Sequence, residues 1–239
     1  MKVILLGHTS CNYEIFNNLI HLAWEKEWET FPTHGQAIAL AAIRQCYSHK
    51  TALEVLKTES EKYFGEQGKE GKRLFNHIVK SGHTSTLEHI HFTFAVESVS
   101  RALLAQATRH RQLSWSVQSQ RYNKFSSDSR SGGFDYVIPE TIAKDKVLAE
   151  EFETMMESQQ YKYNWLIKNG VPQEDARAIL PNATACNLVT SGNLRAWLEF
   201  YNKRKPGNGA QAEIAEFAEQ IKNAIVDVEP WTSDYFNLT

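Results

Sequence analysis

The hydrophobic pattern between residues 89 and 107 constrains the fold of this chain most strongly, because its period changes within one short segment. From residue 90 to residue 96, every second residue is a large apolar one, which predicts a half-buried strand. Val99, Leu103 and Ala107 then follow helical spacing. The sequence therefore predicts a strand that leads directly into a helix.

The rest of the chain also alternates between helical and extended patterns. Apolar residues at helical spacing predict helices around residues 15–24, 38–46, 74–79, 147–167, 194–201 and 214–225. Short apolar runs predict strands at residues 3–6, 134–138 and 184–190. The stretch from Ser126 to Gly133 is rich in Ser, Asp and Gly and predicts a surface loop. The result is a mixed α+β fold with long helices and few strands.

A cationic segment follows the predicted strand and helix. Residues Arg109 to Arg121 include three arginines, one histidine and three serines, and no acidic residue occurs between Ser98 and Ser127. Arginine forms bidentate bonds to phosphate. Cations in contact repel one another by roughly a few kcal/mol per pair unless an anion lies between them. The segment predicts a site for a phosphate-bearing ligand; the alternative is that the charges only interact with a helix dipole.

A second group of polar residues lies between His83 and His91, and it allows three interpretations. His89 and His91 share one face of a strand beside Glu88, but a zinc site needs three or four converging ligands. No CxxC or HExxH motif supplies the others, so no metal is expected. Ser85 and Glu88 match a capping box, although a strand follows them. The third interpretation is a polar loop that faces the same pocket as the arginines.

Composition excludes several classes of protein. The formal net charge of −2 argues against a general nucleic-acid binder. Three widely spaced cysteines without a CxxC pair argue against a disulfide framework and favour a reducing compartment. The apolar run at residues 3–6 is too short for a signal peptide or a membrane span. These features predict a cytoplasmic protein without a membrane segment.

The cationic segment resembles the signature of the flavin-dependent thymidylate synthases. Arg109-His110-Arg111, the seven residues that follow, and Ser119 match an R-H-R-x7-S motif, and Arg121 and Tyr122 complete its S-x-R-Y tail. Further segments resemble the same family: Ala41–Ser48, with one residue inserted, Gly82–His89, Arg177–Pro181, Asn193–Arg204 and Pro230-Trp231. The resemblance covers nearly the whole chain.

The resemblance implies an architecture and a reaction. It implies one domain over residues 1–239, with long helices packed on a small, mostly antiparallel sheet, assembled as a homotetramer with sites shared between subunits. The implied reaction is the methylation of dUMP to dTMP. Its one-carbon donor is 5,10-methylenetetrahydrofolate, and its hydride carrier is FAD reduced by NADPH. No enzyme cysteine attacks the pyrimidine in this family.

The matching motif positions give the expected site residues. By resemblance, FAD contacts His83, Ser85, Glu88, Arg109, His110, Arg111, Asn193 and Arg195. By resemblance also, dUMP contacts Gln106, Arg109, Ser119, Gln120, Arg121, Arg177 and Arg204. Arg204 is the expected catalytic residue, because a cation beside the uracil stabilises charge on its carbonyls and raises the nucleophilicity of C5.

Two departures from the family pattern leave alternatives open. Val117 stands where the family often has Glu or Gln. After Arg204, residues 205–213 contain one extra residue relative to the family pattern R-x3-H-A-Q-x-E, and Gly209 replaces its histidine. A catalytically inactive flavoprotein of the same fold is one alternative. A single-stranded nucleic-acid binder is the other, with the arginines of residues 109–122 on phosphates and aromatic side chains stacked on bases.

Overall fold

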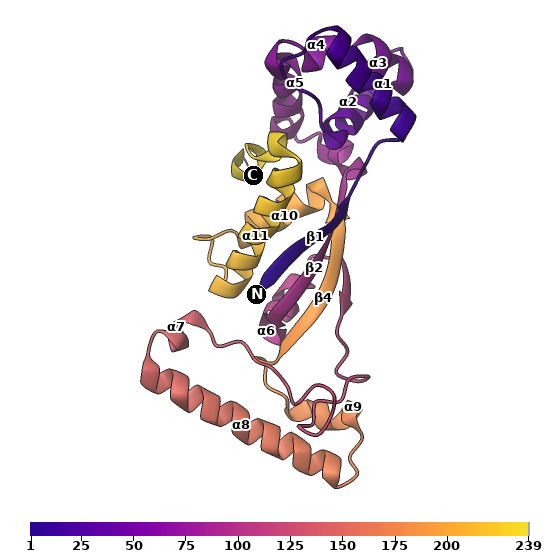
Figure 1. The fold of residues 1–239 in the computed structure, drawn as a ribbon. Helices are drawn as coiled ribbons and strands as arrows, with labels where there is room; N and C mark the ends of the chain where they lie inside the picture. Colours follow the sequence, from indigo (N-terminus) through magenta and orange to yellow (C-terminus); the bar gives the residue numbers. More distant parts are fainter. Residues whose placement is uncertain (239) are drawn as a thin grey trace. The chain divides into compact units, whose positions relative to one another are not determined.

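The computed structural model describes residues 1–238, whose path is drawn in Figure 1. The chain divides into two compact units. The first unit combines Met1–Ile4, Phe94–Thr190 and Pro206–Phe217, and the second combines Leu5–Thr93, Ser191–Lys205 and the chain from Ala218 onward. The expectation of one domain over the whole sequence stays a prediction.

Within residues 1–238, four strands form one antiparallel sheet in the order β1-β2-β4-β3. The strands are β1 Lys2–His8, β2 His91–Ser100, β3 Ser114–Val117 and β4 Ala185–Asn193. The apolar residues that alternate along β2 are buried, since Phe92 and Phe94 are 0% exposed. Both the strand predicted at this position and the α+β fold class with a small antiparallel sheet are confirmed.

The second unit consists mostly of helices, and several of these helices begin after a residue whose side chain caps the first turn. Its helices are α1 Tyr13–Glu25, α2 His34–Tyr47, α3 Ala52–Thr58, α4 Ser60–Phe64, α5 Lys69–Lys80, α10 Leu194–Arg204, α12 Tyr235–Leu238 and the later part of α11 Ala212–Val228, with short 3-10 turns at η1 Glu66–Gly68, η2 Thr84–His89 and η4 Pro230–Thr232. Thr33 and Thr51 each form a capping box, with Gln36 and Glu54. Such boxes satisfy amide groups that the first turn of a helix leaves without partners.

A buried carboxylate holds the start of α2 in this unit. Glu229 is 0% exposed and accepts hydrogen bonds from the Gly35 amide at 2.9 Å and from the hydroxyl of Thr33. A Cβ atom at position 35 would lie 2.6 Å from this carboxylate. Glycine is therefore required at position 35 by close approach, and the helix N-terminus stabilises the buried negative charge.

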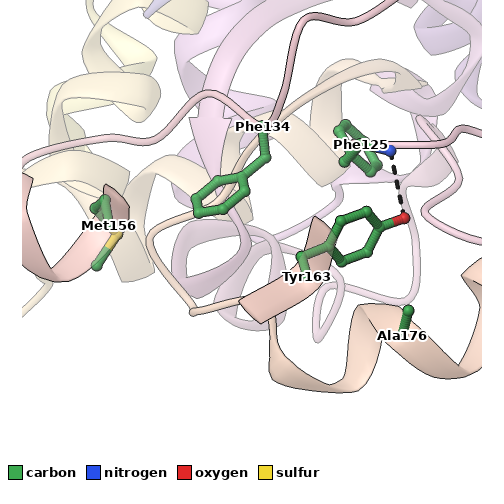
Figure 2. Packing of buried hydrophobic residues seen from close by; sticks show 5 residues of the cluster. All are labelled: Phe125, Phe134, Met156, Tyr163 and Ala176. Carbon is green, nitrogen blue, oxygen red and sulfur yellow. Dashed lines mark hydrogen bonds between the residues drawn. The ribbon is translucent and has the colours of Figure 1, made fainter. Parts of the chain in front are cut away.

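The remaining helices lie in the first unit, which also contains an apolar cluster. They are α6 Arg101–Ala107, α7 Glu140–Ala143, α8 Lys146–Lys168, α9 Gln173–Ala176, the beginning of α11 and the 3-10 turn η3 Arg177–Ile179. Met156 and Tyr163 of α8 belong to a cluster with Phe125, Phe134 and Ala176 (Figure 2). The hydroxyl of Tyr163 accepts a hydrogen bond from the Phe125 amide at 3.3 Å. The long helix predicted at residues 147–167 is confirmed.

Three features differ from the sequence expectations. Residues 134–138 do not form a strand, because their only ladder contact among the described residues is a single antiparallel bridge between Tyr136 and Thr184. Residues 114–117 do form a strand, which their polar composition concealed. Ser85 and Glu88 do not form a capping box; they lie within a 3-10 turn that has no side-chain cap.

Candidate functional site

The strand-to-helix unit of β2 and α6 places the cationic segment at the end of a short helix in the first unit. The amide of His110 donates to the carbonyl of Ala107 at 3.0 Å and so closes the turn that follows α6. His110 is 8% exposed, whereas the neighbouring side chains of Arg109 and Arg111 are exposed. The turn therefore presents two guanidinium groups to solvent on either side of a buried imidazole.

Among the described residues, 1–238, neither of these two arginines has a carboxylate partner. Within residues 1–238, no acidic oxygen lies within ion-pair distance of Arg109 or Arg111. Two guanidinium groups without an internal counterion suit a ligand with adjacent phosphates, because each fork can form bidentate charged hydrogen bonds. The donor chemistry here fits the diphosphate of a dinucleotide.

The third arginine of the segment, Arg121, has an acidic neighbour that comes from outside the segment. Nε of Arg121 lies 3.3 Å from a carboxylate oxygen of Glu174 in α9. Nε of Arg177 donates to the main-chain carbonyl of the same residue at 3.0 Å. Gln173 also donates to the main-chain carbonyl of Arg121 at 2.6 Å. The first unit therefore brings Arg121 and Arg177 together around Glu174, although they are distant in sequence.

The remaining predicted dUMP residues of the first unit lie on α6 and in the turn after β3. The hydroxyl of Ser119 accepts hydrogen bonds from the amides of Arg121 and Tyr122, at 3.1 and 3.3 Å. Gln120, the next residue in that turn, is half-buried. Gln106 lies in the last turn of α6, and its amide nitrogen donates to Gln211 at 2.6 Å. These contacts fix the backbone and side chains on which the predicted site depends.

In the second unit, one arginine of the predicted site lies between two carboxylates. Arg195 donates to Glu88 at 2.7 Å and to Glu199 at 3.0 Å. These two hydrogen bonds, first to Glu88 and then to Glu199, raise the pKa of Arg195 above its ordinary value. The trio has a net negative charge, so it suits hydroxyl or amine donors rather than a second phosphate.

Other predicted residues of the second unit have local partners. Oδ1 of Asn193 caps α10 by accepting a hydrogen bond from the Ala196 amide at 2.8 Å. The cap does not use the two side-chain N–H groups of Asn193. Nδ1 of His83 lies 2.8 Å from the hydroxyl of Tyr47. Ser85 is exposed in the η2 turn. All of these side chains are close to the surface, as ligand-binding residues need to be.

Arg204, the predicted catalytic residue, is the last residue of α10 and is half-buried. The loop that follows it contains Gly207 and Gly209, with φ angles of 80° and 72°. Residues with a side chain rarely adopt such angles. The glycine at position 209 is therefore explained by the backbone, because a histidine there would be strained.

Two of the three cysteine thiols, those of Cys11 and Cys186, do not have the environment of nucleophiles. Burial, followed by the charge of Glu229, raises the pKa of Cys11 to about 11. Burial also raises the pKa of Cys186. A thiol that stays protonated at neutral pH is a poor nucleophile. Cys46 is exposed at the end of α2.

Residues 1–238 contain no group of three or more His, Cys, Asp or Glu side chains that is arranged to hold a metal ion. His89 and His91 thus lack a third ligand of these types within those residues. No helix in the same range has both the length and the apolar character needed to cross a bilayer.

Sequence reasoning missed three residues that contact the predicted site. Glu199 had a local signal, because it stands four residues after Arg195 on a helix, where opposite charges meet. Glu174 gave no such signal, since its approach to Arg121 depends on the packing of α9. Gln211 follows the loop after Arg204 that departs from the family pattern, so the sequence did not indicate which residue Gln211 contacts.

Comparisons with known proteins agree with these motifs. Residues 30–231 match the family model described as thymidylate synthase complementing protein. The chain is 34% identical over 199 residues to a flavin-dependent thymidylate synthase of Geobacter sulfurreducens, covering 83% of this chain and 80% of that protein. It is 39% identical over 202 residues to one from Nitratidesulfovibrio vulgaris, covering 81% and 79%.

A solved structure shares the fold. The crystal structure of the UMP/dUMP methylase PolB from Streptomyces cacaoi, bound with 5-Br dUMP, superposes with a TM-score of 0.72 at 19% identity. The superposition covers 99% of this chain and 94% of that chain. At this identity, the likeness establishes a common fold.

Proposed function

The chain belongs to the thymidylate synthase complementing protein family, and we propose that it acts as a flavin-dependent thymidylate synthase that methylates dUMP to dTMP. The proposal depends mainly on the exposure and the charge partners of the two arginines in the R-H-R segment. Arg109 and Arg111 are exposed and lack a carboxylate partner within residues 1–238. Such groups are suited to an anionic ligand, and the family supplies one in FAD.

We assign FAD contacts on the basis of the donor chemistry in each unit. In the first unit, Arg109, His110 and Arg111 would face the diphosphate. In the second unit, Glu88 and Arg195 would meet hydroxyl and amine groups, and Asn193 would donate through its N–H groups. His83 and Ser85 complete the proposed cofactor residues. The chemistry that bound FAD supplies is hydride transfer, with NADPH as the electron source and 5,10-methylenetetrahydrofolate as the one-carbon donor.

The proposed dUMP residues include the arginines around Glu174. A phosphate dianion would bind Arg121 and Arg177, which contact the carboxylate and the main-chain carbonyl of Glu174, respectively. A dianion that accepts charged hydrogen bonds can replace a solvent-exposed ion pair, because such pairs contribute only ~0–1 kcal/mol. The other proposed contacts to dUMP come from Gln106, Arg109, Ser119, Gln120 and Arg204.

Arg204 is the proposed catalytic residue. Methylation at C5 requires electron density at that carbon, which increases as the uracil ring becomes anionic. A guanidinium group beside the pyrimidine carbonyls stabilises this charge as it develops. The guanidinium group of an arginine carries a permanent positive charge in proteins. Arg204 therefore acts on the reaction by its charge and not by proton transfer.

We also propose that the protein is a cytoplasmic homotetramer with shared sites and that its full length acts as one functional domain. Leu148 and Met155, which are separated by two helical turns on α8, are 52% and 57% exposed. Exposed apolar residues along one helix favour burial against another subunit. The three cysteines form no disulfide within residues 1–238, which agrees with a reducing compartment.

One experiment separates this function from its alternatives. Purified protein is incubated with FAD, NADPH, 5,10-methylenetetrahydrofolate and dUMP tritiated at C5, because methylation must displace that hydrogen. The proposal expects a flavin absorption band, release of tritium and formation of dTMP. A flavin band without either product identifies an inactive flavoprotein. A colourless protein that binds oligonucleotides with steep salt dependence identifies a nucleic-acid binder.

A further inference from the structure

The main chain of His83 is fixed at the end of α5, in the second unit. Gly82 has a φ of 75°, and its amide donates to the carbonyl of Val79 at 3.2 Å, while the amide of His83 donates to the carbonyl of Ile78 at 3.1 Å. These two bonds form a Schellman motif, which satisfies carbonyls that the last turn of a helix leaves without partners. The carbonyl of His83 in turn accepts from the hydroxyl of Thr86 at 3.3 Å. Hydrogen bonds therefore hold the main chain of His83 on both sides.

Tyr47, the last residue of α2, holds the side chain of His83. Its hydroxyl lies 2.8 Å from Nδ1 of the imidazole, and the two rings meet edge to face, with their planes at 83° and their centres 5.8 Å apart. The last turn of α2 is itself fixed, because Arg44 donates to Glu59 at 2.8 Å and these side chains are only 22% and 13% exposed. The final torsion of a histidine side chain is broad and roughly two-fold. The bond to Tyr47 therefore determines which ring nitrogen faces which way.

The chemistry of the two groups sets the direction of this hydrogen bond. A neutral imidazole has one N–H donor and one acceptor nitrogen, whereas a hydroxyl can take either role. Since the acceptor nitrogen of an imidazole is more basic than a phenol oxygen, the phenol of Tyr47 donates to Nδ1. The ring proton then lies on Nε2, because the bond that one ring nitrogen forms determines the state of the other. Within residues 1–238, Nε2 of His83 forms no hydrogen bond, so its N–H is what the side chain can offer a ligand.

We propose that Tyr47 is a positioning residue for cofactor binding, because it holds His83 in the orientation and tautomer that present Nε2–H to FAD. The inference rests on the proposed function, in which His83 is one of the FAD contacts. The complementary group on the cofactor is a hydrogen-bond acceptor. Oxidised flavin has such groups in its carbonyl oxygens and its unprotonated ring nitrogens. Tyr47 acts through His83 and needs no contact of its own with FAD.

A double-mutant cycle on FAD affinity tests whether Tyr47 acts through His83. Tyr47→Phe keeps the aromatic ring and removes only the hydroxyl, so it should weaken FAD binding by roughly two- to tenfold, as for loss of one neutral hydrogen bond. In His83→Ala protein, the same substitution should have no further effect, because the group that it positions is gone. An equal loss in both backgrounds would overturn the proposal. Tyr13→Phe, at a tyrosine that is 78% exposed and has no side-chain hydrogen bond within residues 1–238, is the matched control and should bind FAD like wild type.

Two substitutions of His83 test which ring nitrogen serves the ligand. Glutamine carries its amide N–H groups about as far from the main chain as Nε2, whereas asparagine reaches only the place of Nδ1. In the full-length protein, His83→Gln should therefore retain more FAD affinity than His83→Asn. Flavin fluorescence during titration measures both affinities. Equal affinities, or tighter binding by the asparagine variant, would contradict the assignment of Nε2–H as the donor.

Nitrogen NMR of His83 in protein without FAD separates this inference from the proposed function. With 15N-labelled histidine, at a pH at which the imidazole is neutral, wild type should show an unprotonated Nδ1 and a protonated Nε2; the His83→Ala spectrum assigns the signals. A protonated Nδ1 would contradict the positioning role whatever the protein binds. Wild type that takes up no FAD would contradict the proposed function and this inference together. Wild type that binds FAD with the same affinity as Tyr47→Phe would contradict the positioning role alone.

Discussion

Arg195 donates to Glu88 across 2.7 Å, and this contact joins the first turn of α10 to the η2 turn within the second unit. The two side chains are 42% and 44% exposed. At that exposure, an ion pair contributes only ~0–1 kcal/mol to the free energy of unfolding. The pair therefore contributes little to stability, and its proposed role is to contact FAD.

Replacing Arg195 with Ala should therefore reduce flavin occupancy more than it reduces stability. The expected change in the free energy of unfolding is ~0–1 kcal/mol, and FAD affinity should fall by roughly tenfold or more, as for a charged hydrogen bond. Equilibrium unfolding in urea and flavin titration measure the two effects. Arg73→Ala removes a different exposed ion pair, with Glu70, and should change neither. Unaltered FAD affinity in Arg195→Ala would show that the pair is only structural.

Arg109→Ala and Arg111→Ala should weaken FAD binding without unfolding the chain. Both side chains are exposed and lack a carboxylate partner within residues 1–238, so their removal breaks no internal ion pair there. Loss of a charged hydrogen bond corresponds to roughly a ten- to hundredfold change in affinity. Flavin fluorescence during titration reports that affinity. Arg130→Ala provides an exposed-arginine control in the same unit, and equal affinity in all three variants would contradict the diphosphate assignment.

The sequence predicted the elements whose signal is local. The strand at β2 and the helix at α8 follow directly from hydrophobic periods of two and 3.6 residues. The strand β3 did not, because Ser114–Val117 alternates polar with partly buried residues inside a cationic segment. Residues 134–138 have the composition of a strand, but a strand also needs a paired neighbour, and this segment forms only one bridge.

The same distinction applies to the candidate site. The cationic segment could be recognised from residue types and spacing alone. Its relation to Glu174 could not, because that carboxylate reaches Arg121 only through the packing of α9 in the first unit. Gln211 was equally hidden, since its contact with Gln106 requires both α6 and the start of α11 to be in place. Long-range partners of this kind depend on tertiary structure and not on local pattern.

Raising the pH should destabilise the wild-type protein through Cys11. Burial, and then Glu229, raises the pKa of this thiol from 9.0 to about 11. The folded state thus keeps a proton that the unfolded state loses earlier. The associated stabilisation is fully present below pH 9 and is lost as the pH rises through about 11. Urea unfolding of wild type and Cys11→Ala between pH 8 and pH 11 should show a steeper decline for wild type; parallel curves would contradict the assignment.

Arg204→Ala should affect the chemical step more than dUMP binding. The proposed role of this cation is to stabilise charge that develops as the uracil becomes anionic, so its loss should appear mainly in kcat. Arg204→Lys, which keeps the charge but not the planar fork, should recover part of the rate. Steady-state kinetics with dUMP as the varied substrate separate the two parameters. A rise confined to KM would identify Arg204 as a binding residue instead.

Shared sites in a homotetramer predict that two inactive variants restore each other. Arg121→Ala lacks a proposed phosphate contact, and Arg204→Ala lacks the proposed catalytic cation. If the two residues of one site come from different subunits, a mixed tetramer contains some sites in which both arginines are intact. Mixing the variants after brief dissociation should therefore return partial activity, while each variant treated alone stays inactive. Native mass spectrometry verifies that hybrid tetramers form. Hybrids without recovered activity would mean that Arg121 and Arg204 of each site belong to one subunit, because every site would then carry one of the two substitutions.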